Sequence, residues 1–210
     1  MGLLSIDPRF RVLHDRLEPP GEDPREEPAE HQTERMEAAV AMIIRATTPL
    51  EMLLIKRATF EGDPWSGHMA LPGGRWDRSD AGLMETSIRE TREETGIDLS
   101  AVGTPLGRLP DVNPASPGLP ITRIAPFVFG VPFDAGIVSP NHEVETAHWV
   151  PIDRLRNPDT ATSVRIHFSG FSKTFPSYAL GDEHVWGLTH RILTAFLERY
   201  PAADIRDTER

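Results

Sequence analysis

Hydrophobic positions along the chain gather in short runs that predict a mixture of strands and helices. Compact apolar runs bounded by polar residues predict strands at 38–45, 51–57, 69–71, 125–131 and 147–152. The turn at 47–50 joins the first two strands into a hairpin. Helical spacing predicts helices at 9–17, 81–95 and 183–200, the last of them long and amphipathic. Because the elements do not alternate regularly, we expect an α+β domain with helices packed on a mixed β-sheet.

The polar segments between these elements suggest the domain limits. Residues 1–36 are expected to form an N-terminal arm, with a short helix followed by a linker rich in Pro and Glu. Residues 37–200 would form the main domain, and 201–210 a tail. The Pro-rich stretch 104–123 is read as a loop that can line a pocket.

Composition narrows the classes of protein that fit this pattern. The 210 residues carry a net charge of −10, which argues against non-specific binding to nucleic acid. The chain has no cysteine, so disulfides and thiolate chemistry are excluded. No basic, apolar leader opens the chain, and no apolar run approaches the ~20 residues that span a membrane. We therefore expect a cytoplasmic protein with no membrane partner.

The helix at 81–95 carries three glutamates, Glu90, Glu93 and Glu94, here called the acidic cluster. Their spacing of i, i+3 and i+4 places them on one helical face, and Arg89 can pair with Glu93. Gly96 is a plausible left-handed cap. The opposite face is expected to pack inward through Met84, Ile88, Thr91 and Thr95. The cluster is either a solvated face or a binding site for a divalent cation.

The segment before this helix favours the cation. Leu71–Gly74 leaves a strand and enters a loop whose carbonyls can point at the cluster, and Asp77 and Asp80 add oxygens near the start of the helix. Oxygen ligands alone select hard ions, with Mg²⁺ first and Mn²⁺ or Ca²⁺ next.

Residues 73–97, GGRWDRSDAGLMETSIRETREETGI, resemble the Nudix box. The positions that match are Gly74, Arg89, Glu90, Glu93, Glu94, Gly96 and Ile97. The pattern departs at Asp80, which replaces a glutamate and is separated from Arg89 by eight residues instead of seven. It also departs at Thr91, where an apolar residue is usual.

This resemblance implies a Nudix-type α/β/α sandwich and a hydrolase that cleaves a diphosphate linked to a group X. It implies Glu90 and Glu94 as the main Mg²⁺ ligands, with Glu93 assisting partly through water and the Gly73 carbonyl completing the set. Arg89 would belong to the catalytic group, and Gly74 would lie beside the substrate. The segment 139–152 resembles the one that carries the base, which would be Glu143, with Glu145 as the alternative and the nearby His142 as a surface residue. The substrate would be a small-molecule diphosphate, and a homodimer is left open.

Two further segments resemble coenzyme A diphosphatases: the first is 53–58 followed by 66–74, and the second is 175–197 with its Tyr and Val-Trp-Gly. The implied substrate is coenzyme A or acyl-coenzyme A, cleaved to phosphopantetheine and adenosine 3′,5′-bisphosphate. Lys56 and Arg57 would meet the anionic substrate, although charges on edge strands are also common. Asp63 stands where this subgroup has an arginine. Another nucleoside diphosphate derivative, or a Nudix-like sensor that binds without cleavage, remains an alternative.

Overall fold

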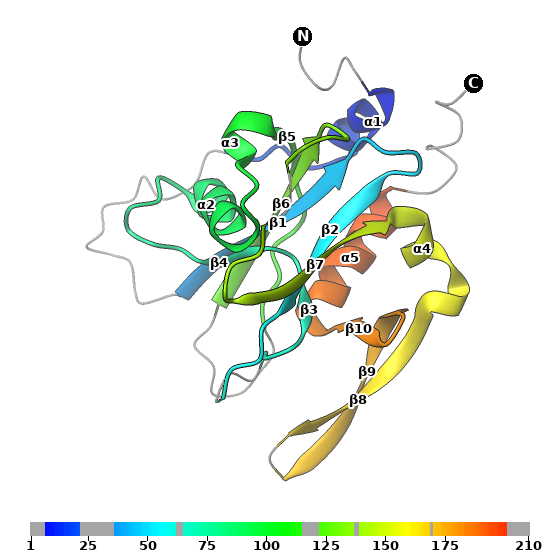
Figure 1. The fold of residues 1–210 in the computed structure, drawn as a ribbon. Coiled ribbons are helices and arrows are strands. Elements are labelled where there is room, and N and C mark those ends of the chain that lie inside the picture. Colours follow the sequence, from blue (N-terminus) through cyan, green and yellow to red (C-terminus); the bar gives the residue numbers. More distant parts are fainter. Residues whose placement is uncertain are drawn as a thin grey trace.

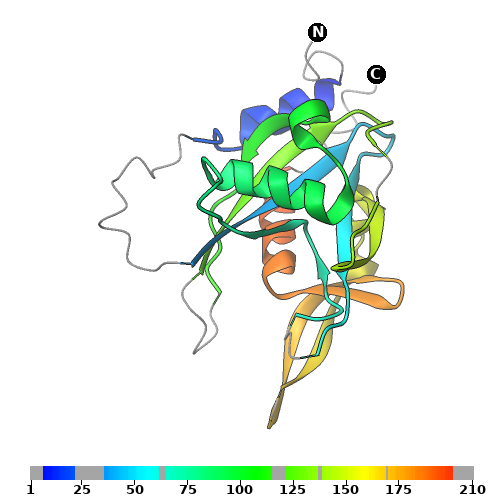
Figure 2. The same ribbon diagram turned by 60° about the vertical axis from the view of Figure 1, so that its left-hand side comes forward.

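A computed structural model describes residues 7–21, 36–61, 65–114, 122–136, 139–168 and 170–200. The main body is a seven-stranded sheet with helices on both faces (Figures 1 and 2). Its strands are β1 (Met36–Arg45), β2 (Glu51–Arg57), β3 (Met69–Ala70), β4 (Gly73–Arg75), β5 (Thr104–Arg108), β6 (Thr122–Val131) and β7 (Val144–Pro151). The order is β3-β2-β1-β6-β5, with β4 also paired to β1 and β7 to β2. The β1–β6 pair is parallel and the other pairs are antiparallel, which confirms the mixed sheet.

The alternation of side chains along β1 builds a core on each face of the sheet. Met42 and Ile44 join the core covered by α1 (Pro8–Arg16), α4 (Ile152–Arg156) and α5 (Gly187–Arg199). Ala39, Ala41 and Ile43 join the other core, under α2 (Leu83–Thr95) and α3 (Leu99–Val102). Figure 2 shows α2 and α5 on opposite sides of the sheet. The expected α/β/α sandwich is therefore confirmed.

The expected short N-terminal helix is present as α1. Its side chains Phe10 and Leu13 are almost fully buried in the core shared with α5, so the helix packs as part of the domain. Glu18 then pairs as an antiparallel bridge with Arg108 on β5. The Pro- and Glu-rich segment 22–35 and the tail 201–210 lie outside the described residues, as does Asp63.

A second sheet was not predicted. It contains β8 (Ala161–Phe168), β9 (Phe171–Leu180) and β10 (Glu183–Trp186), in the order β10-β9-β8, after the 3₁₀ turn η4 (Pro158–Thr160). The β8–β9 ribbon extends away from the body of the molecule (Figure 1). Most described side chains of this ribbon are exposed or half-buried, so the sequence has no strong apolar pattern there.

Some predicted boundaries were wrong. The helix expected at 183–200 is strand β10 followed by α5, because Gly187 takes a positive φ of 67° that separates the two elements. The expected loop at 104–123 begins as strand β5, whose Leu106 is buried against the sheet. The strand expected at 147–152 is β7 and already begins at Val144.

Candidate active site

Helix α2 is held against the sheet by a stripe of small residues. Thr91 and Thr95 are fully buried, and their hydroxyls donate hydrogen bonds to the carbonyls of Ser87 (2.7 Å) and Thr91 (2.6 Å). A threonine at the usually apolar position 91 is therefore tolerated, because its hydroxyl has a partner within the helix. Gly96 ends the helix in the left-handed region with φ of 74°, as the sequence predicted.

The acidic cluster does not share one exposed face, and that prediction was wrong for Glu94. Glu94 is 2% exposed, whereas the side chain of Glu93 is 55% exposed and Glu90 is half-buried. Glu94 follows Thr91 by three residues, so it continues the buried stripe of the helix. Its Oε2 accepts a hydrogen bond of 2.9 Å from the Gly73 N–H.

The two glycines of β4 leave space for close neighbours, the backbone of β1 at Gly73 and the Glu90 carboxylate at Gly74. A Cβ atom at Gly74 would lie 2.4 Å from Cδ of Glu90, inside the space of its carboxylate. A Cβ atom at Gly73 would lie 2.2 Å from the Ala39 carbonyl oxygen of β1. Glycine at both positions therefore lets β4 pair with β1 and lets Glu90 lie directly over the strand.

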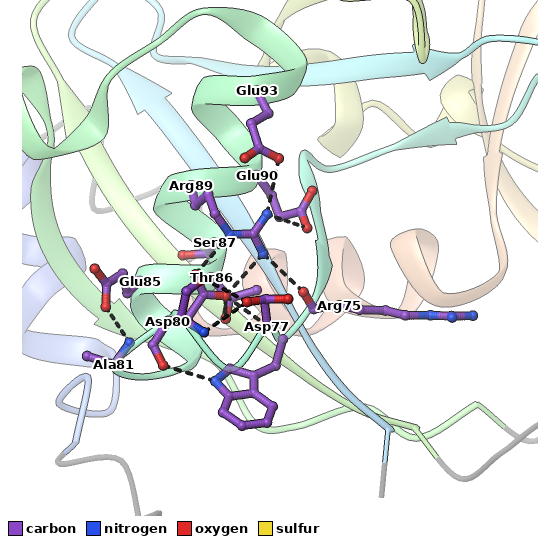
Figure 3. Close-up of polar contacts among 12 residues, drawn as sticks. Arg75, Asp77, Asp80, Ala81, Glu85, Thr86, Ser87, Arg89, Glu90 and Glu93 are labelled. Carbon is purple, nitrogen blue, oxygen red and sulfur yellow. Dashed lines mark hydrogen bonds and ion pairs between the residues drawn. The ribbon is translucent and has the colours of Figure 1, made fainter.

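Arg89 connects the loop before α2 to the acidic cluster (Figure 3). Its Nε and Nη2 donate to the two oxygens of Asp80 at 2.8 and 3.0 Å. Its Nη1 donates to Oε1 of Glu90 at 3.0 Å and to Oε2 of Glu93 at 3.1 Å, which confirms the predicted pair with Glu93. This fork restrains both glutamates from one side.

Asp77 and Asp80 do not supply oxygens to the acidic cluster, contrary to the prediction. Asp80 is 7% exposed, and its oxygens accept from Arg89, from the Thr86 hydroxyl (2.8 Å) and from the Asp77 N–H (3.1 Å). The Asp77 carboxylate accepts from the N–H and hydroxyl of Ser79 within the loop. The sequence signal for the Asp80–Arg89 pair was the opposite charge of the two residues within one motif. The pair was not predicted because the spacing between these residues is longer than in the usual motif.

The loop that carries Glu143 is fastened to the end of α2. The Ser139 N–H donates to the Thr95 carbonyl (2.7 Å), and the Asn141 N–H donates to the carbonyl of Glu94 (3.2 Å). On its other side, the Glu143 carbonyl accepts from the N–H of Ala58 at the end of β2 (2.8 Å). These contacts bring Glu143 toward buried Glu94 and half-buried Glu90 of α2.

Electrostatics confirm that these carboxylates are neighbours. Burial, with the charges of Glu90 and Glu143 adding to it, raises the pKa of Glu94 to about 8, against the Gly73 hydrogen bond and the charge of Arg57. Burial also raises the pKa of Glu90, with Glu93 and Glu143 adding to the effect and Arg89 opposing it. We call Glu90, Glu94 and Glu143 the carboxylate site. Its negative charge is only partly balanced by the protein.

The carboxylate site fits a divalent cation by its chemistry. Within the described part of the chain, no group of three or more acidic or histidine side chains is already drawn together as a complete metal-binding group. The carboxylate of half-buried Glu90 nevertheless lies against Gly74, and that of buried Glu94 bonds to the Gly73 N–H. The pKa of each glutamate is raised. A hard cation would stabilise the charged form of both carboxylates, which burial and, to a smaller extent, mutual repulsion disfavour.

The basic residues at the end of β2 have different surroundings. Lys56 pairs with Glu145 on β7 (2.9 Å) and with Glu183 on β10 (2.8 Å), and these partners raise its pKa. Glu145, the alternative base, is therefore engaged by Lys56. Arg57 lies close enough to the carboxylate site for its charge to lower the pKa of Glu94.

A cavity of about 320 Å³ lies at the other end of α2. It is bordered by Leu83 and Met84 at the start of the helix, and by Arg108, Arg123 and Phe127 of β5 and β6. Arg108 pairs with Asp111, and Arg123 pairs with Glu37. None of the three glutamates of the carboxylate site borders this cavity, so the segment 104–123 contributes to a pocket separate from that site.

Comparison with known proteins agrees with this arrangement. The NUDIX domain family matches residues 34–169. An uncharacterised protein of Schizosaccharomyces pombe is 36% identical over 133 residues, and the match spans 60% of this chain but only 40% of that protein. The uncharacterised Nudix hydrolase NudL of Yersinia pestis is 30% identical over 77% of each chain. The crystal structure of a MutT/nudix family protein from Enterococcus faecalis shares the fold, with a TM-score of 0.53 and 18% identity over 83% of this chain and 65% of that one.

The chain therefore belongs to the Nudix family, and it is a hydrolase of that family. No helix among the described residues is both long and apolar enough to cross a membrane.

Proposed function

We propose that the chain is a divalent-metal-dependent hydrolase that cleaves the diphosphate bond of a nucleoside diphosphate derivative. The first candidate substrate is coenzyme A or acyl-coenzyme A, which would give phosphopantetheine, or its acyl form, and adenosine 3′,5′-bisphosphate. The observation that carries this proposal is the carboxylate site, in which buried Glu94 and half-buried Glu90 lie against Gly73–Gly74 with Glu143 nearby.

Glu90 and Glu94 would hold Mg²⁺, or Mn²⁺ in its place, with Glu93 assisting through water and the Gly73 carbonyl completing the set. When bound, the cation neutralises the diphosphate charge and makes water a better nucleophile. The Gly73 N–H restrains the carboxylate of buried Glu94, and Arg89 restrains the carboxylate of Glu90. Both carboxylates are therefore already positioned for a cation. The exposed Glu93 keeps access to solvent.

Glu143 is the proposed general base. Its carboxylate would accept the proton that water loses as the water oxygen bonds to phosphorus. The bond from that phosphorus to the bridging oxygen breaks, and the bridging oxygen leaves on the second phosphate. Glu145 is less suited to this step because Lys56 holds it at 2.9 Å.

Coenzyme A is supported by the resemblance of two segments to coenzyme A diphosphatases, and the structure brings these segments into contact. His68, from the first segment, lies with its ring centroid 4.7 Å from that of Trp186 in the second. A second candidate, a nucleoside diphosphate derivative with fewer phosphates, is favoured by Lys56. Its two carboxylate partners reduce the positive charge available for the additional 3′-phosphate of coenzyme A.

The test is hydrolysis with Mg²⁺ of a panel that contains coenzyme A, acetyl-coenzyme A, ADP-ribose and a dinucleotide, with products identified by mass. Release of adenosine 3′,5′-bisphosphate as the preferred reaction would support the first candidate, and preference for another member would support the second. Glu94→Gln should lower turnover of the preferred substrate by at least 100-fold, as expected when a ligand of a catalytic ion is lost (about 3 kcal/mol). Glu198→Gln on the exposed side of α5 is the matched control. Unchanged turnover in Glu94→Gln would contradict the proposed mechanism.

A further inference from the structure

An exposed aromatic side chain lies beside the carboxylate site and has no role in the fold described above. Phe60, in the loop after β2, is 46% exposed. Its ring centroid lies 6.5 Å from that of His142, with the two planes at 81°. His142 directly precedes Glu143, and its side chain is 81% exposed. A large apolar ring left open to water next to a reaction centre is a candidate surface for a ligand.

The loop holds Phe60 in place through its backbone. The Ser66 hydroxyl accepts a hydrogen bond from the Phe60 N–H (2.5 Å) and donates to the Phe60 carbonyl (3.1 Å). Two residues earlier, the Ala58 N–H donates to the Glu143 carbonyl. Phe60 is therefore connected by short, ordered backbone to the residue proposed as the base.

The opposite side of this arrangement is fixed to helix α2. Asn141 bonds to the carbonyl of Glu94 through its N–H, and its side-chain oxygen accepts from the Glu143 N–H (2.8 Å). His142 therefore lies, between Asn141 and Glu143, on a loop that is bonded to α2 on one side and to the end of β2 on the other. The two rings are nearly perpendicular, and the exposed part of Phe60 leaves room for a flat group beside His142.

We propose that Phe60 is the stacking surface for the base of a nucleoside diphosphate derivative, with His142 as the side wall, so that the base end of the substrate binds beside Glu143. This inference rests on the proposed function and assigns the part of the site that recognises the nucleoside. Stacking of one base on an aromatic side chain contributes enough to change affinity about 5- to 100-fold. The surface accepts any base, because each base has a π-face.

The experiment compares binding of AMP with binding of ribose 5-phosphate, which carries the phosphate but no base. Calorimetry in the presence of Mg²⁺ on the full chain should show that the wild type binds AMP about 5- to 100-fold more tightly. Phe60→Ala should abolish this difference and leave the affinity for ribose 5-phosphate unchanged, whereas Phe60→Trp should preserve it. Phe171→Ala is the control, because Phe171 is 60% exposed at the start of β9, on the ribbon that extends from the body.

The same variants are then assayed on the best substrate of the panel. Phe60→Ala should raise KM by about the same factor as the loss in AMP affinity and leave kcat within about two-fold. An unchanged preference for AMP over ribose 5-phosphate in Phe60→Ala would overturn the inference even if the enzyme is active. If Phe60→Ala loses the preference for AMP while the wild type cleaves no diphosphate, the inference is supported and the proposed function is refuted.

Discussion

The burial of Glu94 predicts an unusual dependence of stability on pH when divalent metal is removed. Its pKa in the folded chain is about 8, which is about 3.5 pH units above the ordinary value of 4.5. The folded state therefore binds more protons than the unfolded state between pH 4.5 and pH 8. Because the proton is bound more tightly in the folded state, the free energy of unfolding falls as pH rises through this interval and levels off above it.

The magnitude follows from the width of the interval. Each pH unit contributes up to about 1.4 kcal/mol, so raising the pH from 5.5 to 8 should cost about 3 kcal/mol. For a chain of this length, that corresponds to a decrease in Tm of about 6–12 °C. Glu94→Gln retains an oxygen that can accept from the Gly73 N–H but has no proton to lose, so its stability should not show this contribution.

The assay is thermal unfolding of wild type and Glu94→Gln at pH 5.5 and pH 8, with chelator and again with Mg²⁺. The measured quantity is the difference between the two proteins, because groups that do not interact with Glu94 cancel in it. One such group is His190, whose burial lowers its pKa below 6.5 and favours the opposite trend. With chelator, wild type should lose stability relative to Glu94→Gln at the higher pH. Mg²⁺ should restore wild type most strongly at pH 8, where Glu94 is ionised. Parallel behaviour of the two proteins with chelator would refute the reasoning.

Three further predictions concern the neighbours of Glu94. In Gly74→Ala, the added Cβ would displace the Glu90 carboxylate. The protein should still fold, but the Mg²⁺ concentration that gives half-maximal turnover should rise at least 10-fold. Glu143→Gln should lower kcat about 100-fold or more, whereas Glu145→Gln should leave kcat within a few-fold, and similar losses in both would contradict the assignment of the base. Arg89→Lys should lower kcat/KM at least 10-fold and reduce the free energy of unfolding by about 1–3 kcal/mol, measured by urea denaturation, since one ammonium cannot replace the guanidinium fork. A wild-type kcat/KM in Arg89→Lys would contradict the role of Arg89 in restraining Glu90 and Glu93.

Local features of the sequence predicted β1, β2, β3, β6 and β7 of the central sheet, the position of α2 and its cap at Gly96, whereas β4 and β5 were expected to be loops. The apolar runs of β1, β2 and β6 are nearly continuous because both faces of the sheet are buried. The β8–β9 ribbon was not predicted because most of its described side chains face solvent. Its sequence therefore has no strong pattern of apolar residues. The element at 183–186 was misassigned because apolar spacing alone does not distinguish a short buried strand from the first turn of a helix.

For the site, the sequence by itself determined the chemistry: closely spaced glutamates, an arginine among them and two glycines before the helix. These follow from residue identity and helical period, which are local properties. Only the tertiary structure decided that Glu94 is buried, that Asp80 binds Arg89, and that Lys56 forms an ion pair with Glu145. Burial and pairing depend on which distant segments meet. A carboxylate therefore becomes a buried group of raised pKa or the partner of an arginine only when β4, the loop before α2 and β7 come together around it.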